Sequence, residues 1–169
     1  MCIHLNLMIF TKIIRGFISA KLALAANQEL LLKGRDLHKR VATETIEIPK
    51  LVQASADFIE MILETKLGGK ENIYSLSDLT DIAANLKGSQ KIIGVLKPFI
   101  KPETLDKIQQ NEQLINQIMQ TYQLSNTTYQ PYSQLQLKDK MALYSLLTQQ
   151  AETLAKLRAE LDVDVYYKY

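Results

Sequence analysis

Long segments with helical periodicity, each apolar along one side, constrain the fold of this chain more than any other feature. Apolar residues in these segments recur at intervals of three and four positions, which places them on one face of an α-helix. Prolines fall in or beside the breaks between segments, where a residue without a backbone N–H is tolerated; they are Pro49, Pro98, Pro102 and Pro131. Short breaks join consecutive helices as antiparallel neighbours. The sequence therefore predicts an all-α fold, an antiparallel helical bundle of about five long helices.

Residues 1–16 are expected to form a short apolar helix or the worn end of one. The long helices are expected over residues 17–44, 48–67, 76–100, 103–124 and 135–161. The residues expected to face inward are Leu22, Leu24, Leu30, Leu31, Leu37 and Val41 in the helix over 17–44, and Leu51, Ala54, Phe58, Met61, Ile62 and Thr65 in the helix over 48–67. In the helices over 76–100 and 103–124 they are, respectively, Leu79, Ile82, Ala83, Leu86, Ile93 and Leu96, and Leu105, Ile108, Leu114, Ile115, Ile118 and Tyr122. In the last helix they are Leu137, Met141, Tyr144, Leu147, Ala151, Leu154, Leu157 and Leu161. We expect one domain over residues 1–169, with a divergent start over 1–16 and a loose tail over 162–169.

The charge balance and the apolar runs limit the classes of partner. Lys and Arg number 20 and Asp and Glu 18, and the basic residues are scattered, so we expect no nucleic-acid partner. A single cysteine, Cys2, leaves no internal disulfide. Lys12, Arg15 and Lys21 interrupt the apolar start, which falls short of the ~20 apolar residues that span a membrane. We interpret it as a helix rather than as an export signal or a transmembrane segment.

A glycine turn followed by a helix start lies in the middle of the chain. Gly68 and Gly69 are expected to end the preceding helix, because glycine accepts the positive φ that closes a helix C-terminus. Ser75 and Asp78 then resemble a capping box, in which the Ser hydroxyl accepts a hydrogen bond from an unpaired backbone N–H. Asp78 also lies in the first turn, where the helix dipole is positive.

Acidic side chains on both sides of this turn are the candidate functional residues. Glu60 and Glu64 are four residues apart and share a helix face, while Glu71, Asp78 and Asp81 follow the glycines. Carboxylate oxygens suit hard cations such as Fe³⁺, Mn²⁺ or Ca²⁺. A solvated turn before a capped helix is the alternative explanation of the same residues. The sequence contains no nucleophile elbow, phosphate loop or HExxH motif that would indicate an enzyme.

The run KLGGKENIYSLSDLTDIAANLKGSQ, residues 66–90, resembles the C-terminal part of the imelysin-like/EfeO family. The residues that match are Lys66, Gly69, Glu71, Tyr74, Ser75, Asp78, Leu79, Asp81, Ala84, Asn85, Gly88, Ser89 and Gln90. The resemblance extends over residues 25–161, and the last helix fits the closing helix of the family. Because members of this family are larger, we expect a truncated or divergent member.

This resemblance implies a bacterial cell-envelope or periplasmic protein that serves iron uptake by binding rather than catalysis. The implied cargo is iron or another divalent or trivalent metal ion, and the implied partners are other iron-uptake components. Family members carry a His-x-x-Glu motif on an upstream helix, where both side chains can bind one cation. His4 matches the histidine, whereas Leu7 stands at the carboxylate position. The residues that we predict as metal ligands are His4, Glu60, Glu64, Glu71 and Asp78.

Two other functions remain open. Leu7 favours a structural or interaction bundle that kept the fold and lost the metal site. A hydrolase with a water-activating metal ion is the third hypothesis. Residues 1–10 leave almost no polar side on a helix, so we also expect self-association through an exposed apolar N-terminal face.

Overall fold

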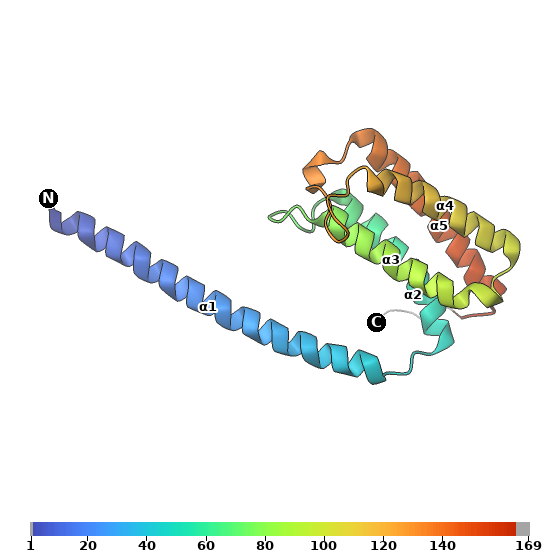
Figure 1. Cartoon of the computed structure of the whole chain (residues 1–169), viewed down its shortest axis with the longest axis horizontal. Coiled ribbons are helices and arrows are strands. Elements are labelled where there is room, and N and C mark those ends of the chain that lie inside the picture. The colour runs from blue at the N-terminus through green and yellow to red at the C-terminus, as the bar shows by residue number, and fades with distance from the viewer. Residues whose placement is uncertain (1, 165–169) are drawn as a thin grey trace. The chain divides into compact units, whose positions relative to one another are not determined.

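The computed structural model describes the backbone of residues 2–164 and the side chains of residues 19–164. The chain divides into two compact units, Met1–Thr45 and Ile46–Tyr169. Its helices and 3₁₀ turns (η), shown in Figure 1, are α1 (Cys2–Thr43), α2 (Ile48–Glu64), η1 (Lys66–Gly68), α3 (Asp78–Leu96), η2 (Lys97–Phe99), α4 (Pro102–Gln120), η3 (Tyr132–Gln134) and α5 (Leu137–Glu160). The described residues form no β-strand, and the predicted all-α fold is confirmed. No helix within them combines the length and the apolar character needed to cross a bilayer.

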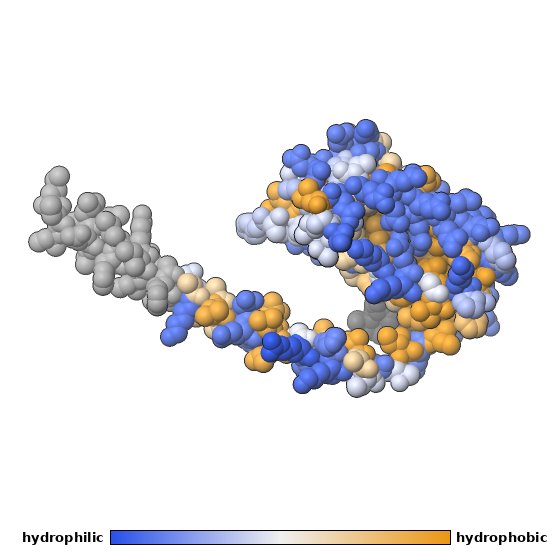
Figure 2. All heavy atoms as spheres, in the orientation of Figure 1, coloured by the Kyte–Doolittle hydropathy of each residue, from blue (hydrophilic) through white to orange (hydrophobic). Residues whose placement is uncertain are grey.

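The first unit is a single helix. α1 runs without interruption for 42 residues, so the predicted separation of residues 1–16 from 17–44 is wrong. A lone helix has no second element on which to bury an apolar face, and within this unit the leucines of α1 stay exposed, for example 68% for Leu30 and 54% for Leu37. Hydrophobic (orange) spheres along α1 are visible in Figure 2. The predicted inward face of this helix is therefore not buried in its own unit.

The second unit starts as the sequence predicts. Residues 44–47 separate α1 from α2, and Pro49 lies in the first turn of α2, where its missing N–H breaks no helical hydrogen bond. The buried face of α2 differs from the predicted one, since Met61 is 43% exposed and Thr65 is exposed. The residues that α2 buries are Val52, Ser55, Ala56, Ile59 and Ile62.

α2 packs against both α3 and α5, and α4 packs against α5. Two hydrogen bonds between side chains tie opposite ends of α4 and α5, from Thr104 Oγ1 to Glu160 Oε1 at 2.9 Å and from Tyr122 OH to Asp139 Oδ2 at 2.5 Å. Because the residue numbers rise on one helix as they fall on the other, α4 and α5 run antiparallel. Figure 1 shows these four helices as a bundle.

α2 and α3 approach each other closely at small residues. The Ser89 hydroxyl donates a buried hydrogen bond of 2.9 Å to the Ser55 carbonyl. A Cβ atom at Gly88 would lie only 3.0 Å from the Phe58 ring. The predicted inward face of α3 is confirmed, because Leu79, Ile82, Ala83, Leu86, Ile93 and Leu96 are all buried. The helix itself ends at Leu96, earlier than predicted, where the chain enters η2 ahead of Pro98.

The apolar side of α5 is wider than its buried face. Leu147, Leu154 and Leu157 lie in the core as predicted, together with Leu143. The predicted inward residues near the start of the helix are instead exposed, with exposed fractions of 72% for Leu137, 65% for Met141 and 59% for Tyr144. This part of the prediction is wrong, because the periodicity continues on a flank of α5 that no other helix of the unit covers.

Candidate functional site

The α2–α3 turn holds most of the polar side chains that the sequence singles out. η1 follows α2, and Gly69 closes it with a φ of 65°, as predicted. A Cβ at Gly69 would lie 1.9 Å from Tyr132 Cε1, so only glycine fits beneath this ring. Tyr132 donates hydrogen bonds from its hydroxyl to the Leu67 carbonyl at 2.5 Å and from its backbone N–H to the Leu76 carbonyl at 2.8 Å. The loop before α5 therefore fixes the turn.

The predicted capping box does not form. α3 begins at Asp78 after Ser77, and no side chain caps it. The Ser75 hydroxyl lies 3.0 Å from the Ser77 hydroxyl. The Ser77 carbonyl accepts the N–H groups of Thr80 and Asp81 at 2.9 and 3.2 Å. Asp78 thus starts the helix, and its carboxylate is free to serve another purpose than capping.

A buried lysine neutralises part of the acidic turn. Lys66 is 8% exposed, and its Nζ lies 2.7 Å from Glu71 Oε2 and 3.9 Å from Asp81 Oδ2. The Thr65 hydroxyl also donates to Glu71 Oε2 at 3.3 Å. The hydrogen bond from Lys66 is the main cause that lowers the pKa of Glu71. The predicted ligand Glu71 is therefore held as an ion pair.

Asp78 is the predicted ligand whose hydrogen bonding the turn leaves incomplete. Its side chain is fully buried. The amide of Asn72 donates to Asp78 Oδ1 at 3.1 Å and to Asp81 Oδ2 at 2.6 Å. Asp78 Oδ2 has no hydrogen-bond partner among the described residues. A buried carboxylate oxygen without a donor is costly, so this atom requires a cation, a water molecule or a donor.

A second unpartnered polar group lies on α3. Asn85 follows Asp78 by seven residues, two helical turns, and so lies on the same face. Its Nδ2 is buried without an acceptor in the described part of the chain. Asn85 matched the family pattern in sequence, and its buried amide now marks the same side of α3 as Asp78.

Glu60 and Glu64 lie on another flank of α2. By helical periodicity they share that flank with Leu63 and Leu67, which line a pocket next to α5. The flank that contacts α3 carries Ser55 and Phe58 instead. Both glutamates are exposed. The structure thus brings Glu71 and Asp78 to one turn and places Glu60 and Glu64 elsewhere.

The remaining predicted ligand, His4, has its side chain outside the described residues. Over those residues, no three His, Cys, Asp or Glu side chains are arranged to hold a metal ion. Sequence reasoning missed Lys66 and Asn72 as members of the polar cluster. Lys66 had matched the family pattern, whereas the signal for Asn72 is its spacing from Asp78, which becomes informative once the turn has folded.

Comparison with known proteins places the chain in a family. No family model matches it. It is 36% identical over 132 residues to the iron uptake system component EfeO of Shigella boydii serotype 4 (strain Sb227), covering 76% of this chain and 35% of that protein. It is 34% identical over 134 residues to an Efem/EfeO family lipoprotein of Staphylococcus aureus (strain USA300), covering 77% of this chain and 47% of the lipoprotein.

A further Efem/EfeO family lipoprotein, from Staphylococcus aureus (strain MSSA476), is 32% identical over 133 residues. The chain therefore spans less than half of the length of these curated relatives. The resemblance seen in residues 66–90 is confirmed by matches that cover about three quarters of the chain. By these similarities the chain belongs to the EfeO family.

Proposed function

We propose that this chain is a cell-envelope component of iron uptake that acts by binding a metal ion rather than by catalysis. The names of its relatives support this, one as an iron uptake system component and others as lipoproteins. The expected cargo is iron or another divalent or trivalent cation. The expected partners are further uptake components of the envelope. In this proposal Asp78 is the anchoring ligand at the α2–α3 turn, while the predicted ligand His4 stays a prediction, because its side chain lies outside the described residues.

The single observation that carries the proposal is the fully buried Asp78 carboxylate, whose Oδ2 has no partner among the described residues. A carboxylate oxygen that is desolvated and has no donor destabilises the fold until a cation or a donor reaches it. Proteins retain such destabilising groups where they serve a function.

Titration of the full chain with Mn²⁺, and with Fe²⁺ under argon, tests the site by calorimetry and by thermal unfolding. The wild-type chain should bind one ion, and an ion concentration of 100 times Kd should stabilise it by about 2.7 kcal/mol. Asp78→Asn keeps the shape and removes the charge. We expect this variant to lose the stabilisation by metal and to be at least as stable as the wild type in chelator.

Asp106→Asn is the matched control, because Asp106 is an exposed aspartate of α4. It should keep both the metal binding and the metal-free stability of the wild type. Equal metal affinity in Asp78→Asn and the wild type would remove Asp78 from the site. A wild-type chain that binds neither ion would contradict the proposed function.

A structural bundle that has lost its metal site is the second candidate, and Lys66 favours it. The ammonium group of Lys66 already takes the place of a cation beside Glu71 and Asp81. Lys66→Met separates the two functions. In a scaffold this variant is destabilised, since it leaves the acidic groups unpaired, and neither it nor the wild type gains stability from metal. In a metal-binding protein the variant gains affinity, because the competing internal cation is gone.

A further inference from the structure

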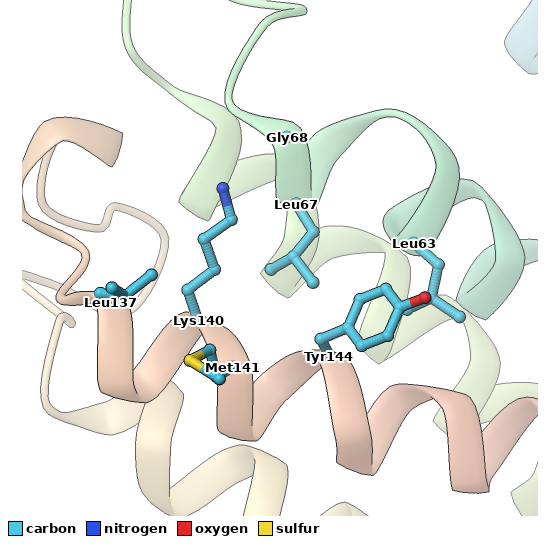
Figure 3. A pocket seen from close by; sticks show the side chains of 7 residues that line it. All are labelled: Leu63, Leu67, Gly68, Leu137, Lys140, Met141 and Tyr144. Carbon is cyan, nitrogen blue, oxygen red and sulfur yellow. The ribbon is translucent and has the colours of Figure 1, made fainter.

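An apolar groove between α2 and α5 is a surface feature of the bundle that the proposed function does not use. Leu63 and Leu67 form one wall, and Leu137, Met141 and Tyr144 form the other. Figure 3 shows the Tyr144 ring beside Leu63 and the Lys140 side chain reaching across the far end towards Gly68. The cavity measures about 360 Å³. Its α5 wall is the exposed flank of that helix, at 59–72% exposure.

The two walls of the groove differ in charge. Glu60 and Glu64 follow the α2 wall at intervals of one turn, and neither forms an ion pair with a described residue. Lys140 lines the α5 wall, where its Nζ is 5.6 Å from the centre of the Tyr132 ring, and it forms no ion pair with a described residue. Acidic groups without ion pairs thus lie beside the α2 wall, and the α5 wall carries a lysine whose charge is balanced by no carboxylate of the described residues.

From these features we propose that the groove is a self-complementary interface for a second copy of this chain. In Figure 3 Leu63 lies beside Tyr144, and Gly68 lies farther along the groove on the side of Lys140, so α2 and α5 run antiparallel along the groove. A twofold axis parallel to these helices places α2 of one copy over α5 of the other. The acidic wall then meets the basic wall twice, as an isologous interface requires. Glu64 comes within about one helical turn of Lys140 in the second copy.

The proposal accounts for the apolar side chains as well. Met141 and Tyr144 would insert between the walls of the second copy. Their apolar surface would thereby be removed from water, and this burial is the main driving force of association. A patch of this size predicts a weak dimer, with Kd on the order of 10–100 μM. Its formation needs no metal ion, so its test is independent of the proposed iron-binding function.

Charge reversal and mixing test the interface in chelator, by light scattering and sedimentation of the full chain at 1–300 μM. Glu64→Lys and Lys140→Glu each place like charges face to face, and each should weaken self-association at least about tenfold. A one-to-one mixture of the two variants restores both opposite-charge contacts in a heterodimer. We therefore expect the mixture to associate within about threefold of the wild type.

Two further variants control this experiment. Lys156→Glu reverses a charge on an exposed part of α5 away from the core face and should leave dimerisation unchanged. Met141→Glu should abolish it and should not be rescued by mixing. All variants should keep the helical circular dichroism of the wild type. A monomeric wild type at 300 μM, a dimer indifferent to Glu64 and Lys140, or a mixture that stays monomeric would each overturn the proposal.

Discussion

Glu112 lies on α4 between the buried residues Ile108 and Ile115 and is half-buried. Its Oε1 is buried without a partner in the described part of the chain, and desolvation raises the pKa of this carboxyl to about 7. The hydrogen bonds at the two ends of α4 and α5 set a register that places Gln150 at the same level. Gln150 is 1% exposed, and both of its amide atoms lack partners among the described residues. Two polar side chains with unpartnered buried atoms thus lie at the same level of the α4–α5 hairpin.

The raised pKa of Glu112 gives the bundle a dependence on pH. The folded chain holds this proton between pH 4.5 and about 7, whereas the unfolded chain releases it, so the free energy of unfolding falls as pH rises through this window. Because the side chain is partly solvated, we expect a loss of about 1–2 kcal/mol between pH 5 and pH 8. Urea unfolding at the two pH values measures it.

Glu112→Gln should flatten this profile, since no proton is then exchanged at the position. Glu152→Gln, at an exposed position of α5, should keep the wild-type slope. If both variants lose stability with rising pH as the wild type does, the pH dependence does not come from Glu112.

Gly69 and Gly68 are neighbours with opposite tolerance for a side chain. A Cβ at Gly69 collides with the Tyr132 ring and the φ is positive, whereas a Cβ at Gly68 meets nothing within 4 Å. We expect Gly69→Ala to lower the free energy of unfolding by about 2–3 kcal/mol, because the ring must move and lose its bond to Leu67. Gly68→Ala should change it by less than about 0.5 kcal/mol. Chemical denaturation compares them, and equal losses would contradict the role given to Tyr132.

At the scale of elements, the Ser89–Ser55 hydrogen bond joins α2 to α3 in a position without access to water. Ser89→Ala leaves the Ser55 carbonyl without this donor, so we expect a destabilisation of about 1–2 kcal/mol. Ser145→Ala, on the exposed face of α5, should have little effect. Thermal and urea unfolding decide the comparison, and a Ser89→Ala chain as stable as the wild type would show that water replaces the bond.

Periodicity predicts the buried face of a helix only where one apolar row exists. α3 has one such row, and its predicted core residues are correct. α2 and α5 each carry two, so the sequence cannot decide between them; Met61 and Met141 were expected inside and lie outside. The site shows the same limit. Asp78 could be chosen from its position after the glycines, but the ion pair at Glu71 and the amide of Asn72 depend on how the turn folds in three dimensions.

At the scale of the whole molecule, the division into two units predicts independent stability. α1 is a helix without a core, and isolated helices are marginally stable in water, whereas the bundle buries a continuous hydrophobic cluster. Limited proteolysis should first cut near residues 39–47 and release a fragment that starts close to Ile46. Mass spectrometry identifies the fragment, and its melting temperature should equal that of the full chain. Equally rapid cleavage inside the bundle would contradict the division.

Tyr132 touches two separate regions of the bundle. Its hydroxyl binds the Leu67 carbonyl beneath the acidic turn, and its ring lies under the ammonium group of Lys140 at the end of the groove. A change that tilts the Tyr132 ring therefore disturbs both the acidic turn and the end of the groove. If an ion that reshapes the turn strengthens or weakens the proposed pairing of two chains, thermodynamic reciprocity requires that pairing changes the affinity for the ion by the same factor.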